Sequence, residues 1–100
     1  MAKEVFLTPI AEKNYEAITD YVFEKFGAIV VNNFIERFGE ACMLISENPE
    51  IYPFSNKIKQ IRKCVVTKHN TIYFKEYPDL IRIIVVFDNR QDPEKLDRFI

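Results

Sequence analysis

The stretch "IRIIVVFDNRQDP", residues 81–93, decides how this chain folds. Its first half is almost entirely apolar and rich in β-branched residues, which indicates a central strand covered on at least one face. Its second half turns abruptly polar, from Asp88 to Asp92. Because Asp92 can cap a helix and Pro93 suits the first helical position, a short helix or turn should follow.

Two further apolar runs precede this strand, "QIRKCVVT" at 60–67 and "TIYFKEY" at 71–77. The segments between the runs, "KHN" and "PD", are short enough for hairpin connections, so the three runs should form an antiparallel meander. The segment 48–60 contains two prolines and mixed polar residues, and we expect a loop there.

A short strand should lead directly into a first helix near the N-terminus. The apolar run 5–7 is followed by Thr8 and Pro9. Thr8 can accept hydrogen bonds from the unpaired N–H groups of the first turn, and Pro9 suits a position where its missing N–H is not needed. Apolar residues then recur among charges until Phe26, and Gly27 can adopt the left-handed conformation that often closes a helix.

The second helix carries the clearest periodicity of the chain. Its apolar residues lie three, one, three, three, one and three positions apart, which is the spacing of one face of an amphipathic helix. They are Val31, Phe34, Ile35, Phe38, Ala41, Cys42 and Ile45. Pro49 ends the helix, because the residue before a proline avoids helical geometry. Since only Gly27 and its neighbours separate the two helices, they should form an antiparallel hairpin.

These elements predict an α+β fold in a single domain, residues 1–100. We expect an N-terminal strand, a two-helix hairpin packed on a mainly antiparallel sheet of about four strands, and a short C-terminal helix or tail. The composition suits such a domain, with 48% hydrophobic and 29% charged residues. No run approaches the apolar length that spans a bilayer, and the first residues lack the core of a signal peptide, so we expect a cytoplasmic protein.

Charge and residue types argue against several classes of function. Fourteen Lys and Arg against fifteen Asp and Glu give a net charge of -1. This balance disfavours a protein that holds nucleic acid by bulk charge alone, but leaves a local basic patch open. Cys42 and Cys64 lie in apolar patterns and should be buried thiols rather than a disulfide. With one histidine, His69 in a predicted solvated turn, and no Cys-x-x-Cys pair, we expect neither a metal site nor a cofactor.

Arginines inside the predicted strands are candidates for a functional surface. Arg62 and Arg82 are each flanked by apolar residues. Each must therefore form an ion pair, extend to an edge of the sheet or present its guanidinium to a ligand. If their strands are neighbours, both arginines can share one face, with Lys57, Lys59 and Lys63 near by. Such a cationic patch would suit a phosphate or an acidic protein segment.

A structural interpretation of the same arginines is equally open. Both can face solvent and pair with acidic residues such as Glu76, Asp79 or Asp88. If the last strand stays regular, Arg90 lies on the same face as Arg82, and Asp88 with Arg90 can instead form a structural turn. The spacing of these residues does not decide between the two interpretations.

Over nearly its whole length the chain resembles the RelE/ParE family of toxins from bacterial type II toxin–antitoxin systems. The resemblance runs from "VFLTPIAEKNYEAITDYV" through the helical hairpin and "ENPEIYPF" to "IRKCVVTKHNTIYFK" and "IRIIVVFDNRQDPEKL". It lies in the order, lengths and placement of these segments rather than in one specific motif. It implies a growth-inhibiting toxin of a plasmid stabilisation system, neutralised by a cognate antitoxin protein that covers apolar grooves and basic patches.

One branch of the family implies an enzyme. RelE-like members are mRNA interferases that cleave messenger RNA on the ribosome with basic residues of the sheet. Arg62 and Arg82 match the positions of those arginines, and a lysine of the pair Lys57 and Lys59 would complete the set that stabilises the phosphate. However, the Tyr or His-Tyr pair that follows the last strand in such members is missing, since residues 87–89 are Phe, Asp and Asn. Proton transfer by this route would be impaired.

The other branch implies a binding toxin. ParE-like members poison DNA gyrase by a protein contact and need no catalytic residues. The segment "VVFDNRQDPEKL" resembles the end of that branch, which is linked to toxicity. We therefore favour a ParE-like gyrase inhibitor whose target contacts are Arg82, Asp88 and Arg90, with the ribosome-dependent nuclease as the alternative. A third alternative is a degenerate, non-toxic interaction module.

Overall fold

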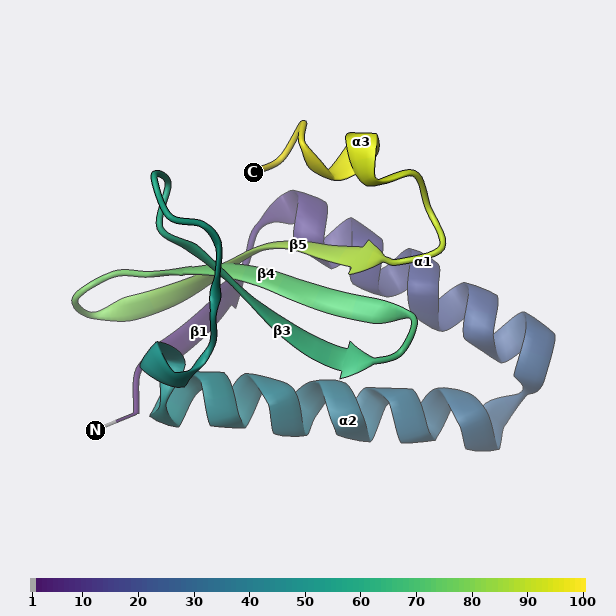
Figure 1. The fold of residues 1–100 in the computed structure, drawn as a ribbon. Helices are drawn as coiled ribbons and strands as arrows, with labels where there is room; N and C mark the ends of the chain where they lie inside the picture. The colour runs from purple at the N-terminus through teal and green to yellow at the C-terminus, as the bar shows by residue number, and fades with distance from the viewer. Residues whose placement is uncertain (1) are drawn as a thin grey trace.

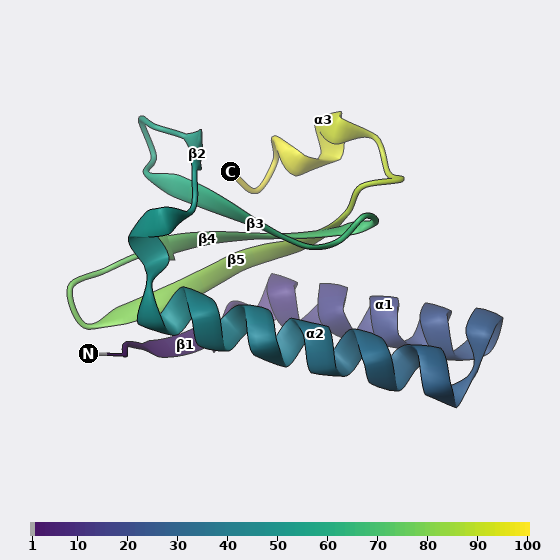
Figure 2. The same cartoon turned by 60° about the horizontal axis from the view of Figure 1, so that its bottom comes forward.

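The computed structural model describes residues 2–100, in which a helical hairpin packs on one face of a five-stranded sheet and a short C-terminal segment lies on the other (Figures 1 and 2). The elements are β1 (Glu4–Leu7), α1 (Pro9–Phe26), α2 (Ala28–Glu47), the 3-10 turn η1 (Pro49–Ile51), β2 (Phe54–Asn56), β3 (Ile61–Thr67), β4 (Asn70–Glu76), β5 (Leu80–Asp88) and α3 (Pro93–Leu96). The α+β fold expected from the sequence is confirmed. Among residues 2–100, no helix is both long enough and apolar enough to span a bilayer.

The sheet has the order β1-β5-β4-β3-β2. β1 pairs in parallel with β5, and all other pairs are antiparallel. β3, β4 and β5 form the predicted meander. β2 is a fifth strand within the segment expected to be a loop. It has three residues, and its pairing with β3 shifts register between Phe54 and Asn56, so it is too short and irregular to show a strand periodicity in the sequence.

The predicted signals at the ends of the helices are present. The Thr8 hydroxyl accepts a hydrogen bond from the Ala11 N–H at 3.1 Å, and Pro9 is the first residue of α1. Gly27 has φ of 88°, a conformation that favours glycine, and it alone separates α1 from α2. The chain therefore reverses within one residue, and the two helices run side by side beneath the sheet in Figure 2.

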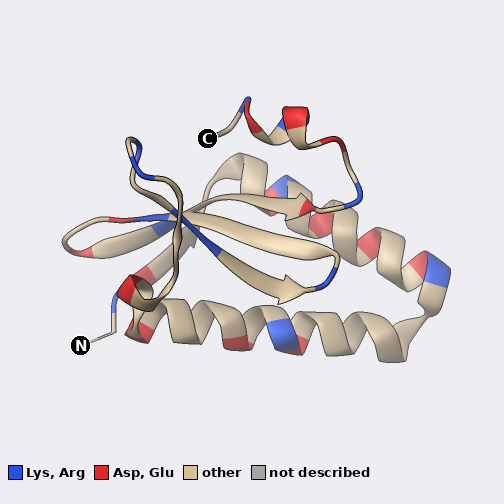
Figure 3. Cartoon of the chain, in the orientation of Figure 1, with Lys and Arg blue, Asp and Glu red and all other residues tan. Residues whose placement is uncertain are grey.

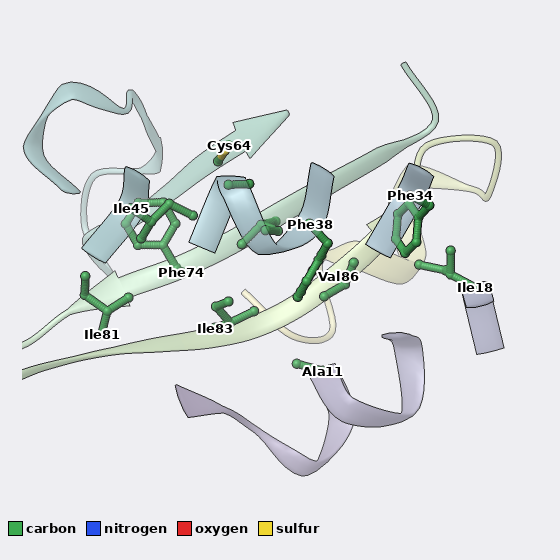
Figure 4. Packing of buried hydrophobic residues seen from close by; sticks show 12 residues of the cluster. Ala11, Ile18, Phe34, Phe38, Ile45, Cys64, Phe74, Ile81, Ile83 and Val86 are labelled. Carbon is green, nitrogen blue, oxygen red and sulfur yellow. The ribbon is translucent and has the colours of Figure 1, made fainter. Parts of the chain in front are cut away.

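The main core fills the space between the hairpin and the sheet (Figure 4). In this view Ile45 of α2 points towards Phe74 of β4 and Phe38 points towards Val86 of β5, and both strand residues are buried. Cys42 and Cys64 are free thiols; Cys64 is buried, as expected, whereas Cys42 is only partly buried. Burial, with a smaller contribution from Cys64, raises the pKa of the Cys42 thiol to about 11, so it stays protonated near neutral pH.

A second, smaller cluster lies on the opposite face of the sheet. Its buried members are Ile61, Tyr73, Val85 and Phe87. Leu96 and Ile100, from the C-terminal segment 93–100, pack against it. The C-terminal segment therefore covers part of the face that the hairpin leaves open, which we call the open face.

β5 is not a regular strand. Tyr73 of β4 is opposite Val85, but the next residue, Phe74, is opposite Ile83, so Ile84 is an extra residue in β5. As a result Val86 belongs to the main core between the hairpin and the sheet, whereas Arg82 projects from the open face. The simple alternation from Arg82 to Arg90 considered for a regular strand does not occur.

Candidate functional site

Arg62 and Arg82 lie on opposite faces of the sheet. β4 separates their strands. Arg62 is opposite Phe74, whose side chain is in the main core between the hairpin and the sheet. Arg82 is opposite Lys75, which projects from the open face. Residues directly opposite each other in a sheet project from the same face. The two arginines therefore do not form the shared patch that neighbouring strands would have produced.

The guanidinium of Arg62 is occupied by contacts within the chain. Its Nη1 donates to the Tyr52 carbonyl at 2.6 Å and to the Glu50 carbonyl at 3.3 Å. Its Cζ lies 4.0 Å from the centroid of the Phe54 ring. Arg62 thus fastens the segment containing η1 and β2 to β3. Its contacts are structural, but its partners are backbone carbonyls and an aromatic ring rather than the acidic residues considered from the sequence.

Arg82 is exposed and lies directly opposite Lys75. Both cations lie near the Tyr77 ring, with Lys75 Nζ 5.6 Å and Arg82 Cζ 5.7 Å from its centroid. Glu76 pairs with Lys3 at 2.6 Å, and within residues 2–100 no carboxylate lies within 4 Å of either Lys75 or Arg82. Like charges in this arrangement repel each other, so the pair favours a negatively charged partner.

The predicted lysines are spread around the open face. Lys63 is opposite Tyr73 and is exposed. Lys57 is exposed in the connection between β2 and β3, and Lys59 Nζ donates to the backbone oxygen of Ile100 at 2.9 Å. Figure 3 shows Lys and Arg on the strands, while several acidic residues lie along α1.

Asp88 and Arg90 form a two-bond ion pair at the end of β5. Arg90 Nη2 lies 2.8 Å from Asp88 Oδ2, and Nε lies 3.0 Å from Oδ1. The Arg90 backbone N–H also donates to Oδ1 at 3.0 Å. These hydrogen bonds lower the pKa of the Asp88 carboxyl, so Asp88 is ionised.

Tyr21 of α1 holds the other side of Arg90. Arg90 Cζ lies 4.9 Å from the Tyr21 ring centroid, and Nη1 lies 3.5 Å from the phenol oxygen. This contact could not be predicted from the sequence, because Tyr21 has the pattern of an ordinary apolar position of an amphipathic helix. Arg82 and Arg90 are eight residues apart along an extended segment, on the order of 25 Å, so they do not form one cluster.

Apolar side chains are exposed where the helical hairpin turns. Phe23, Phe26, Ile29 and Val30 have exposed fractions of 56, 58, 78 and 43%. Phe26 and Val30 also line a hollow of about 550 Å³ between the hairpin and the β3–β4 turn. The turn of the hairpin therefore exposes a cluster of large apolar side chains, which is typical of a surface that binds another protein.

Comparisons with known proteins agree on the fold. A family model described as the ParE toxin of a type II toxin-antitoxin system, parDE, matches residues 5–93. A chain from the chromosomal ParDE system of P. aeruginosa superposes with a TM-score of 0.74 at 12% identity, covering 87% of this chain and 96% of that one. A chain of the E. coli DinJ-YafQ toxin-antitoxin complex gives 0.61 at 11% identity, covering 90% and 96%. No curated protein sequence matches.

Proposed function

The chain belongs to the ParE toxin family of type II toxin–antitoxin systems, and from this premise we propose that it inhibits growth by binding DNA gyrase and is neutralised by a cognate antitoxin. A toxin of this kind acts by a protein contact and needs no catalytic residues. Such a contact is favoured by charged side chains that are held in place before binding, because less rotamer freedom is then lost.

The observation that carries this proposal is the fixed guanidinium of Arg90. Asp88 holds two of its five N–H donors, and a third points to Tyr21. Its side chain remains 43% exposed, against 19% for Asp88. Two donors are therefore free for an acceptor on a partner surface. Arg82, on the open face, provides a second contact with its charge unpaired.

Neutralisation by an antitoxin is supported by the exposed apolar residues at the turn of the hairpin. Four large side chains surround Gly27 there: Phe23, Phe26, Ile29 and Val30. An apolar cluster of this size on a small domain is typical of a protein–protein contact. We propose that a segment of the antitoxin covers it.

A supercoiling assay tests the gyrase proposal. Purified protein should inhibit supercoiling of relaxed plasmid by gyrase, and Arg82→Ala and Arg90→Ala should each raise the concentration for half inhibition at least tenfold. Lys13→Ala removes an exposed charge of α1 outside the proposed contact and should behave as wild type. A wild-type protein that arrests growth but leaves gyrase active would refute the proposal, and one that does not arrest growth without its antitoxin would favour the non-toxic module.

The ribosome-dependent nuclease is a second candidate because Tyr77 lies beside Arg82 and Lys75. A phenol hydroxyl can transfer a proton, and two cations can stabilise a phosphate. This route would use Arg82, Lys75 and Tyr77, without Arg62. Primer extension on translated messages should then show discrete cuts that Tyr77→Phe abolishes, whereas the gyrase proposal predicts intact messages.

A further inference from the structure

A groove of about 600 Å³ runs between α1, the last part of β5 and the C-terminal segment. We call it the β5-edge groove. Residues 85–88 of β5 lie along it, α1 from Asn14 to Tyr21 forms one wall, and Lys95, Arg98 and Phe99 form the other. Its volume is within the usual range of ligand-binding clefts.

The groove follows a strand edge that has no partner strand. β1 ends at Leu7, which is opposite Ile83, whereas β5 continues to Asp88. Directly after β1, Thr8 occupies the next two backbone acceptors of β5. Its N–H donates to the Ile83 carbonyl at 3.0 Å, and its hydroxyl donates to the Ile84 carbonyl at 2.8 Å. Beyond Ile84, no described strand pairs with this side of β5.

The side chain of Asn14 takes the place of a strand partner. Its Oδ1 accepts the Val86 N–H at 3.1 Å. On the opposite side, the Asn89 N–H donates to the His69 carbonyl at 2.7 Å, so residue 89 points towards the β3–β4 turn. Because successive backbone groups alternate, the Val86 carbonyl and the Asp88 N–H point to the same side as Asn14. They offer an acceptor and a donor to another backbone.

One wall of the groove, formed by the segment after β5, carries positive charge, whereas the residues of α1 that line the groove are uncharged. Arg90, Lys95 and Arg98 line it, and the one acidic residue in its lining, Asp88, is paired with Arg90. Over residues 2–100, no carboxylate lies within 4 Å of Lys95 or Arg98. Lys95 and Arg98 therefore present two unpaired positive charges to the groove, whereas the acidic residues of the same segment, Asp92, Glu94 and Asp97, are not in its lining. Carboxylates are the side chains that complement it.

We propose that the β5-edge groove binds an extended, acidic peptide segment of a partner protein. The segment continues the line of β1, pairs its backbone with Val86 and Asp88, and places carboxylates against Lys95 and Arg98. The open edge spans roughly 15 Å, which is the length of about five extended residues. A peptide backbone is the ligand that matches a free strand edge, and side chains of alternate residues supply the selectivity. The inference does not depend on gyrase being the target.

Nuclear magnetic resonance of the ¹⁵N-labelled full chain tests this proposal. The probes are a blocked peptide of sequence Val-Glu-Val-Glu-Val, the matched Val-Lys-Val-Lys-Val peptide, and glutarate as a free dicarboxylate. The glutamate peptide should shift the Val86 and Asp88 amides and the Asn14 side-chain amide. The lysine peptide should bind at least tenfold more weakly, and glutarate should leave the Val86 and Asp88 amides unchanged.

Charge-reversal variants localise the site. K95E/R98E should weaken the glutamate peptide at least tenfold, whereas K63E/K68E, with the same change of charge outside the groove, should bind as wild type. The proposal would be overturned if both peptides bound equally well, or if the shifts lay outside the groove. It would also be overturned if glutarate caused the same shifts as the glutamate peptide, because the groove would then be an adventitious anion site only. If K95E/R98E fails to fold, the comparison of the two peptides on the wild-type chain still decides the outcome. The supercoiling assay tests the gyrase proposal separately, so the two proposals can fail independently.

Discussion

Arg90 lies over the ring of Tyr21, with its Cζ 4.9 Å from the ring centroid, while its guanidinium forms two hydrogen bonds to Asp88. Arg90, two residues beyond the end of β5, is thereby fastened to Tyr21 of the first helix, 69 positions earlier in the chain. The polar residues after β5 are thus held in place by contacts of Arg90 with Asp88 and Tyr21, and these contacts leave part of the Arg90 guanidinium exposed.

The Asp88 pair should make stability depend on pH in acid. Arg90 lowers the pKa of the folded Asp88 carboxyl below its unfolded value of about 3.9. The contribution of the pair is therefore complete above that unfolded value and is lost as the pH falls through the lower, folded value. Urea unfolding at pH 6 and pH 2 should show Asp88→Asn losing less stability on acidification than wild type, by about 1 kcal/mol. Equal losses in the two proteins would contradict this assignment.

Substitution of Arg62 should lower stability, whereas substitution of Arg82 should lower inhibitory activity. Arg62→Ala removes two hydrogen bonds and the contact with Phe54, so the free energy of unfolding should fall by about 2 kcal/mol, while the folded protein keeps its inhibitory activity. Arg82→Ala should change stability by less than about 0.5 kcal/mol, because its charge is unpaired and repelled by Lys75, but should lose activity. Urea unfolding and the supercoiling assay measure the two effects, and loss of activity in folded Arg62→Ala would argue against this division.

Local signals explain how much of the fold could be predicted. Thr8 and Pro9 mark the start of α1, Gly27 marks the reversal, and the stripe from Val31 to Ile45 shows which face of α2 is buried. Each of these signals depends on residues within a few positions of one another. Backbone conformation, hydrogen bonding at helix ends and side-chain periodicity act over that range, so they can be read without the tertiary structure.

The candidate site could not be predicted in the same way, because its geometry depends on pairing between distant segments. β4 lies between the strands of Arg62 and Arg82, and the extra residue at Ile84 changes which side chains of β5 face the hairpin. A shift of one residue moves a side chain to the other face of a sheet. The contact between Tyr21 and Arg90 likewise appears only when α1 crosses the end of β5.

Thr8 should stabilise the junction between β1, α1 and β5. Its hydroxyl accepts from Ala11 and donates to Ile84, so one side chain caps the helix and ties it to the bulged strand. Thr8→Ala should lower the free energy of unfolding by about 1–2 kcal/mol, whereas Thr8→Ser keeps the hydroxyl and should lose less than half of that. Equal destabilisation by both substitutions, measured by urea unfolding, would show that the methyl group matters rather than the hydrogen bonds.

Asn14 should protect the Val86 amide from hydrogen exchange, since its Oδ1 is the acceptor that a neighbouring strand would otherwise supply. Asn14→Ala leaves this N–H facing the β5-edge groove without a protein partner, so its exchange should accelerate at least tenfold, with a loss of stability of about 1 kcal/mol. Asn14→Asp retains an acceptor oxygen and should preserve protection. If the Val86 amide stays protected in Asn14→Ala at matched global stability, another group must cover the edge of β5, and the strand edge would not be available to a peptide.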